Sequence, residues 1–216
     1  MSPNCHALPS GAGPASSLRG VLLPLPDGDF KAYLFDCDGT ITDSMPAHHR
    51  AWLAALGEWG GDFPEDLFYA WGGRTVVDVI TDLNTRQGLT MPVAEVAARR
   101  EELFQEMLGS ISPVPGVLEH IEASYGRIPF AVVSGSTRES VTASLTAVGL
   151  LDRFEALVCA EDYTRPKPDP EGYLLGARLL GVDPRDCLVF EDTDLGVAAA
   201  EAAGMRYSRV PAPWER

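Results

Sequence analysis

The sequence is short of basic residues and of long apolar runs, and each shortage excludes a class of protein. Its 216 residues include 17 Lys and Arg against 31 Asp and Glu, which gives a formal net charge of −14. An acidic chain of this kind is a poor partner for nucleic acid or for an anionic membrane surface. No apolar run reaches the length that a bilayer-spanning helix requires. We therefore expect neither a nucleic-acid partner nor a membrane partner.

Cysteine is also scarce, and the four cysteines form no CxxC pair. Cys37, Cys159 and Cys187 stand in or beside apolar runs that read as strands, whereas Cys5 lies near the start of the chain. A reduced, buried thiol is the ordinary state of a cysteine in such a run. The pattern favours a reducing, cytoplasmic location. The length suits a core domain with a modest insertion, and we expect a monomer.

Residues 1–29 differ in composition from the rest of the chain. Residues 1–20 are rich in Pro, Ser, Gly and Ala, and they lack the charged start and sustained apolar stretch of a signal peptide. Residues 21–26 (VLLPLP) are too short and too interrupted by proline to anchor the chain in a membrane. We expect residues 1–29 to be an extension that lies over the surface or is mobile.

Two carboxylates, Asp36 and Asp38, stand at the end of an apolar run. Residues 33–35 (YLF) read as a buried strand, and Gly39 then ends the extended pattern. A strand directs residues i and i+2 to the same side, so both carboxylates can point at one spot. Such a pair suits a Mg²⁺ ion, and it also suits a division of labour between a nucleophile and a proton carrier. The alternative is an ordinary Asp-Gly turn.

Three further apolar runs indicate a parallel sheet. They cover residues 131–133, 156–159 and 187–190, with helix-length segments between them. Continuous apolar runs are typical of strands that are covered on both faces. The residues that follow such strands lie at the sheet edge where open α/β folds bind ligands. In this chain the polar residues at that edge are Ser134, Gly135, Ser136, Lys167, Glu191 and Asp192.

Between residues 45 and 112 the period changes from strand to helix. Apolar residues at helical spacing predict helices over residues 47–56, 75–83 and 93–108. Residues 113–117 (PVPGV) then look like a return to the core. We expect a core domain of residues 30–44 and 113–216, with a helical cap domain of residues 45–112. Closure of such a cap would exclude water from the site.

The order of these motifs resembles that of the haloacid dehalogenase superfamily. The motifs are DxDGT at residues 36–40, a strand-terminal Ser134, Lys167 between prolines, and the acidic pair 191–192, and they span about residues 30–212. The sequence is similar to the β-phosphoglucomutase-like branch of sugar phosphatases and mutases at residues 38–44 (DGTITDS), His48, residues 50–52 (RAW), residues 167–170 (KPDP) and Gly196. The resemblance implies a Rossmann-like parallel sheet with helices on both faces and a small α-helical cap.

Each candidate residue has an expected role. Asp36 would attack phosphorus and form an aspartyl phosphate, because a cation neutralises the oxygens that would repel it. Asp38 would be the general acid and base, and the resemblance implies that its backbone carbonyl also contacts the metal. Asp192 is the expected Mg²⁺ ligand, with Glu191 either a second ligand or bonded to a metal-bound water. Lys167 would supply fixed positive charge.

The loop after residue 133 is the expected phosphate cradle. The Ser134 hydroxyl and the amides of Gly135 and Ser136 suit an anion. Serine is also favoured as a helix N-cap, and Ser134 can fill both roles. An extra acid, Asp194, reads as a surface or capping group.

Two histidines and one arginine belong to the predicted cap. His48 and His49 cannot chelate one ion together, because adjacent helical residues point about 100° apart. The resemblance suggests a hinge or substrate contact for His48. Arg74 lies in residues 72–75 (GGRT), where mutases of the branch grip a distal phosphate, but it stands one place earlier than expected.

These patterns predict a Mg²⁺-dependent phosphatase that acts on a small phosphorylated metabolite, above all a sugar phosphate such as a hexose phosphate. One alternative is a sugar phosphomutase, in which a sugar hydroxyl takes the place of water. The displaced Arg74 weakens that reading. The other alternative is a non-catalytic member that binds a phosphorylated ligand, and the presence of a nucleophile, Asp36, argues against it.

Overall fold

Five parallel strands form one sheet in this computed structural model, which describes residues 23–215. The strands are β1 (Ala32–Phe35), β2 (Phe130–Val133), β3 (Ala156–Val158), β4 (Cys187–Glu191) and β5 (Arg206–Arg209). Their order is β3-β2-β1-β4-β5, with Leu34 of β1 opposite Ala131 and Val189. The order therefore reverses beside β1, and open α/β sheets bind ligands at such a reversal. The predicted α/β sheet is confirmed.

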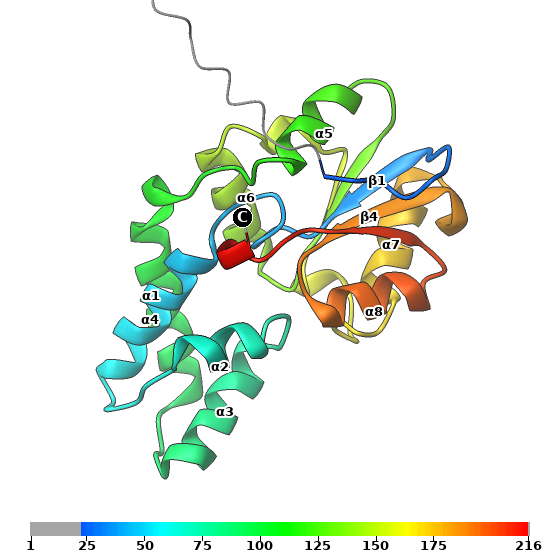
Figure 1. Ribbon diagram of the computed structural model, residues 1–216. Coiled ribbons are helices and arrows are strands. Elements are labelled where there is room, and N and C mark those ends of the chain that lie inside the picture. The colour runs from blue at the N-terminus through cyan, green and yellow to red at the C-terminus, as the bar shows by residue number, and fades with distance from the viewer. Residues whose placement is uncertain (1–22, 216) are drawn as a thin grey trace, which may run out of the picture.

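Helices cover both faces of the sheet (Figure 1). One face carries α5 (Val117–Ser124) and α6 (Arg138–Ala147), and the other carries α7 (Glu171–Leu180) and α8 (Asp194–Ala202). Alternate residues of β1 serve the two cores: Phe35 packs with α5 and α6, whereas Leu34 packs with α7 and α8. Because both faces are buried, the strands read as continuous apolar runs.

Four of the helices between β1 and β2 lie within residues 45–112, which we call the helical insert. The helices are α1 (Met45–Gly57), α2 (Glu65–Ala70), α3 (Val76–Gln87) and α4 (Val93–Glu106). Trp52, Phe63 and Ile80 belong to an apolar cluster that the insert forms by itself. The helices expected over residues 47–56, 75–83 and 93–108 are present, and α2 is an addition that the sequence pattern did not predict.

Short 3₁₀ turns connect several of these elements. They are η1 (Leu108–Ser110), η2 (Leu151–Arg153), η3 (Ala160–Asp162), η4 (Pro184–Asp186) and η5 (Pro213–Glu215).

The predicted N-terminal extension lies largely outside the described residues, which begin at residue 23. Leu23 and Leu25 pack against the core on the α5 side. The ring of His120 lies 2.8 Å from the carbonyl of Leu23, and Ser208 donates to the carbonyl of Pro24 at 3.0 Å. Residues 23–25 therefore lie over the core. Among residues 23–215, none of the helices is long and apolar enough to cross a membrane.

Candidate active site

The catalytic and phosphate-binding residues proposed from the sequence line a single pocket of about 300 Å³. We call it the central pocket. Its polar side comes from the carboxyl ends of the strands, and Trp52, Phe63 and Trp71 of the helical insert form an apolar side. The predicted residues that line it are Asp36, Asp38, His48, Arg74, Ser134, Gly135, Ser136 and Lys167.

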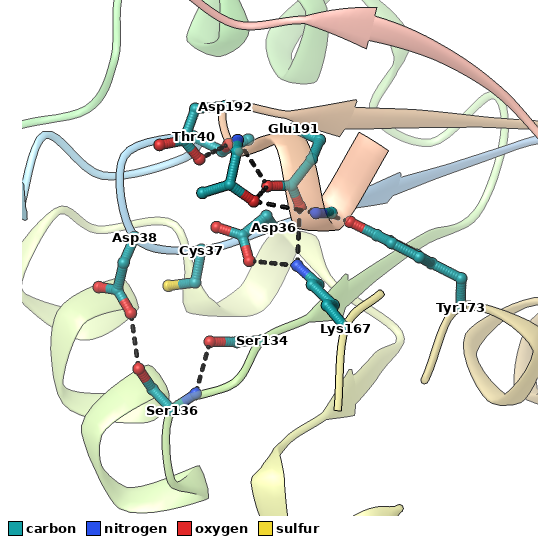
Figure 2. Close-up of polar contacts among 12 residues, drawn as sticks. Asp36, Cys37, Asp38, Thr40, Ser134, Ser136, Lys167, Tyr173, Glu191 and Asp192 are labelled. Carbon is teal, nitrogen blue, oxygen red and sulfur yellow. Dashed lines mark hydrogen bonds and ion pairs between the residues drawn. The ribbon is translucent and has the colours of Figure 1, made fainter. Parts of the chain in front are cut away.

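Asp36 follows β1 directly, and its carboxylate faces Lys167 (Figure 2). The Nζ atom of Lys167 donates to Oδ1 of Asp36 at 2.6 Å and to Oε2 of Glu191 at 2.7 Å. Burial opposes the charge of Lys167, but the two carboxylates outweigh it and hold the lysine pKa well above its usual value. Lys167 therefore keeps its positive charge in this nearly dry setting.

Glu191 ends β4, and hydrogen bonds occupy both of its carboxylate oxygens. Besides Lys167, Oε2 accepts from the hydroxyl of Tyr173 at 2.6 Å. Oε1 accepts from the amide and the hydroxyl of Thr193, at 2.9 and 2.6 Å. Burial raises the pKa of Glu191, but Lys167, Thr193 and Tyr173 outweigh it and lower the pKa. A Cβ atom at Gly196 would lie 2.0 Å from the carboxyl carbon, so this carboxylate packs directly on α8.

Asp36, Glu191 and Asp192 form an acidic cluster in which one oxygen of each lies within 4.8 Å of the others. Oδ1 of Asp192 accepts from the Thr40 hydroxyl at 2.8 Å. Burial and the charge of Glu191 raise the pKa of Asp192 to about 7, and burial also raises the pKa of Asp36 despite Lys167. Two acids with raised pKa values indicate a shortage of positive charge. Oxygen donors so arranged fit a divalent cation such as Mg²⁺.

Asp38 has a different set of partners from Asp36, although both line the central pocket. Oδ1 of Asp38 accepts from the Ser44 hydroxyl at 2.8 Å and lies 3.0 Å from Nε2 of His48. Oδ2 accepts from the Ser136 hydroxyl at 2.7 Å. Burial would raise the pKa of Asp38, but His48, Ser136 and Ser44 outweigh it and place the pKa well below its usual range. The pKa values of the two carboxylates are thus shifted in opposite directions, and their surroundings differ.

His48 lies between Asp38 and Arg100 of α4. The Nη2 atom of Arg100 is 2.5 Å from Nδ1 of His48. A guanidinium group only donates, so Nδ1 must accept and Nε2 must carry the proton that it donates to Asp38. Burial and the positive charge of Arg100 both lower the pKa of His48. Asp38 raises it, but the net pKa lies below the usual value. The neutral imidazole therefore connects the helical insert to Asp38.

The loop after β2 turns tightly around Ser134. The Ser134 hydroxyl accepts from the amide of Ser136 at 3.0 Å, and the Tyr163 hydroxyl donates to the Ser134 carbonyl at 3.0 Å. The N-cap of α6 is Thr137, whose side chain accepts from the amide of Ser140. The alternative reading of Ser134 as the helix cap is therefore wrong.

The recorded contacts of Arg74, His49 and Asp194 are with residues outside the acidic cluster. Arg74 donates to Asp82 at 2.6 Å, and its guanidinium carbon lies 4.4 Å from the centroid of the Trp71 ring. His49 contacts a backbone carbonyl, so the two histidines do not share a ligand, as expected. Asp194 is exposed and lies 3.1 Å from Arg209.

Arg100, Tyr163 and Tyr173 are among the residues of the site that were not singled out from the sequence. Arg100 belongs to a charged amphipathic helix, α4. In such a helix the sequence alone does not distinguish a buried arginine from the solvent-exposed ones. Tyr173 had a signal, because it falls on the first turns of a helix six residues after Lys167, and a buried tyrosine hydroxyl needs a partner. Tyr163 lies in a loop with no recognisable pattern.

The chain is similar to a known protein family and to several known proteins. The family model for haloacid dehalogenase-like hydrolases matches residues 30–204. The chain is 36% identical to fructose-1-phosphate phosphatase YqaB of Escherichia coli K12, over 82% of this chain and 94% of that protein. It is 34% identical to hexitol phosphatase A of the same organism, over 85% of this chain and 84% of that protein. The crystal structure of β-phosphoglucomutase (pgmB) from Clostridium difficile superposes on this protein with a TM-score of 0.75. The superposition includes 82% of this chain and 83% of that chain. At 22% identity it shows a shared fold.

The chain belongs to the haloacid dehalogenase-like hydrolases, and its relatives include sugar phosphatases. Within that family it is a phosphomonoester hydrolase. The family membership and the enzyme class expected from the motif order are both confirmed.

Proposed function

We propose that the enzyme uses Mg²⁺ to hydrolyse a small phosphorylated metabolite, in particular a hexose phosphate, through an aspartyl-phosphate intermediate. The observation that carries the proposal is the meeting in one buried pocket of the Asp36 carboxylate, the Lys167 ammonium and a second, separately bonded acid, Asp38. The similarity to a fructose-1-phosphate phosphatase and a hexitol phosphatase supports a sugar phosphate as the substrate.

In the first step Asp36 attacks phosphorus, and the bond between phosphorus and the sugar oxygen breaks. Asp38 gives that oxygen a proton. In the second step Asp38 removes a proton from water, which attacks phosphorus and frees Asp36. The hydrogen bonds of the free enzyme keep Asp38 ionised, which is the state that the second step needs. The first step needs a protonated Asp38, which would take up a proton from solvent as substrate binding displaces one of its donors; the Ser136 hydroxyl, which also lines the pocket, is our candidate for the displaced donor.

The metal would be held by Asp36 and Asp192, and the backbone carbonyl of Asp38 is a further candidate. An ionised carboxylate offers about four acceptor sites, and Glu191 already accepts four hydrogen bonds. We therefore assign Glu191 to holding Lys167 in place rather than to direct contact with the ion. When bound, Mg²⁺ supplies positive charge that offsets the charge of the phosphoryl oxygens.

Lys167 and the loop after β2 would bind the phosphoryl group. Ser134, which is buried, lines the pocket together with Gly135 and Ser136 of the same turn. Backbone amides in such a turn, together with a hydroxyl, suit the oxygens of an anion. Lys167 adds a charge that stays fixed while the phosphoryl group moves from the sugar to Asp36.

The helical insert would act as the cap domain, over a core of residues 30–44 and 113–216. Its own apolar cluster supports independent packing, and Trp52, Phe63 and Trp71 give the pocket a wall against which a sugar can pack. The hydrogen bond between His48, which Arg100 contacts from within the insert, and Asp38 is a link through which the position of the insert would affect Asp38.

A phosphomutase needs a positive group in the insert to hold a second phosphate. Arg74 is the arginine of the expected loop, and it is engaged by Asp82 and by the ring of Trp71. This supports hydrolysis over transfer to a sugar hydroxyl. The test is the release of free phosphate from hexose monophosphates with Mg²⁺ and no added bisphosphate. Isomerised sugar phosphate that forms faster than free phosphate, and only with a bisphosphate, would instead identify a mutase.

A further inference from the structure

A second recess adjoins the central pocket. It lies between α2, the first turn of α8 and residues 209–213, and its volume is about 1050 Å³. We call it the side groove. Met45, Trp71, Gly72, Arg74 and Thr193 line both recesses and so form the wall between them.

The acidic cluster is divided between these two recesses. Asp36 lines only the central pocket, together with Lys167 and Ser136. Asp192 lines only the side groove. An ion held between Asp36 and Asp192 can therefore be approached from two directions, one of which does not pass the phosphate-binding residues.

The two recesses differ in charge. Three carboxylates and three basic groups line the central pocket, so its charges balance: Asp36, Asp38, Glu101, Arg74, Arg100 and Lys167. Four carboxylates and two basic groups line the side groove, which leaves an excess of negative charge: Glu65, Asp66, Asp192, Asp194, Arg74 and Arg209. A cleft with an excess of one charge concentrates ions of the opposite charge and speeds their arrival. The side groove therefore suits a cation, and the central pocket suits an anion at Lys167.

Gly72 and Gly73 allow the wall between the two recesses to pack closely against α8. A Cβ atom at Gly72 would lie 3.4 Å from Cγ2 of Thr193, and one at Gly73 would lie 3.4 Å from Cβ of Leu195. The loop of the helical insert thus rests directly on the first turn of α8. While this contact holds, the loop lies between the two recesses, with Asp192 on the groove side.

We propose that the divalent cation enters and leaves through the side groove, while the phosphorylated substrate uses the central pocket. The inference rests on the proposed function, because it takes Asp36 and Asp192 as the metal ligands. Glu65 and Asp66, exposed acids of the groove, would draw the cation in. The metal could then exchange independently of the substrate, which a single shared entrance would not allow.

The test uses Mn²⁺ as the probe and matched variants of the whole chain. Association and release rates of Mn²⁺ are measured by stopped-flow quenching of tryptophan fluorescence and a chelator chase, and equilibrium binding by electron paramagnetic resonance. Ala212→Trp places a bulky side chain in the side groove, and Ala97→Trp places one in the central pocket. A blocked route slows entry and exit by the same factor and leaves Kd unchanged, whereas a damaged site changes Kd.

We expect Ala212→Trp to slow Mn²⁺ association and release about tenfold each, at unchanged Kd, because entry then waits for a rearrangement of the protein. Ala97→Trp should leave both rates unchanged and raise the KM for a sugar phosphate. Slower Mn²⁺ exchange in Ala97→Trp, with normal exchange in Ala212→Trp, would overturn the proposal and place the metal route in the central pocket.

A charge variant provides a second test. Glu65→Gln combined with Asp66→Asn should slow Mn²⁺ association about tenfold at low salt and reduce its salt dependence. The control, Glu95→Gln with Glu106→Gln, removes two exposed acids of α4 that line neither recess. Equal rates in the two double variants would contradict the proposed route.

A separate outcome identifies failure of the metal site itself. If Mn²⁺ binding does not depend on Asp192, as judged by Asp192→Ala, the proposed metal site is wrong and the route proposal is overturned with it. If Mn²⁺ binding depends on Asp192 but the groove variants leave its rates unchanged, only the route is wrong.

Discussion

Asp192 makes the stability of the metal-free enzyme depend on pH in a direction that the structure fixes. Burial and the neighbouring charge of Glu191 raise the pKa of Asp192 from 3.8 to about 7 in the folded protein. The folded state therefore holds this proton more tightly than the unfolded state does. The stabilisation is fully present below the unfolded pKa and is lost as the pH rises through about 7.

The magnitude follows from the interval between the assay pH and the folded pKa. Between about pH 5 and pH 8 the loss from this one group is roughly 2.5 kcal/mol in the free energy of unfolding. For a chain of this length that corresponds to a fall of roughly 5 to 10 °C in Tm. A bound cation replaces the proton at the cluster, so Mg²⁺ should stabilise the enzyme more at the higher pH than at the lower one.

The assay is thermal or urea unfolding at both pH values, in chelator and in excess Mg²⁺. Asp192→Asn cannot ionise at this position, so the variant should lose the part of the fall that Asp192 contributes and most of the Mg²⁺ effect. Asp194→Asn is the matched control, because that carboxylate is exposed and bonds only to Arg209 in the described contacts. If the wild type and Asp192→Asn show the same pH dependence in chelator, the electrostatic account of the cluster is wrong.

Other predictions concern the neighbours of the two catalytic acids. Lys167→Ala should lower kcat by about 10²- to 10³-fold in a phosphate-release assay, and Lys167→Arg should restore only part of it. Tyr173→Phe removes a donor from Glu191, so unfolding experiments should show a loss of about 1 kcal/mol, and kcat should fall while KM stays unchanged. In the wild type, ¹⁵N NMR of His48 should show Nδ1 as the unprotonated nitrogen. In Arg100→Met the Nδ1 signal should shift towards that of a partly protonated nitrogen, and an unchanged spectrum would contradict the tautomer assignment.

The sequence predicts the sheet, and the gathering of the candidate residues at one edge of it, because both depend on local patterns. Strands buried on both faces must be apolar throughout, and polar residues at their ends must meet at one edge of a parallel sheet. The strand β5 escaped prediction because Arg206–Arg209 (RYSR) lies at the edge of the sheet and is largely polar. The helix α2 has only six residues, too few to show a period.

The parts of the site that the sequence does not predict depend on long-range packing. Arg100 contacts His48 across 52 positions of the chain, and Tyr173 reaches Glu191 from a different element. The pattern of alternating side chains suggested that Asp36 and Asp38 share one environment. It could not show that Ser136, 98 positions away, would give Asp38 its own donors. The side groove likewise exists only because α2 and the C-terminal segment lie beside α8.

The most direct test of the account is phosphate release from a panel of hexose and hexitol phosphates, with Mg²⁺ and no bisphosphate, by the wild type and by Asp36→Asn. The substitution keeps the shape of the side chain but removes the attacking charge. We predict free phosphate from the wild type and a loss of about three orders of magnitude or more in the variant. Retention of about a tenth of the wild-type rate by Asp36→Asn would contradict the assignment of Asp36 as the nucleophile.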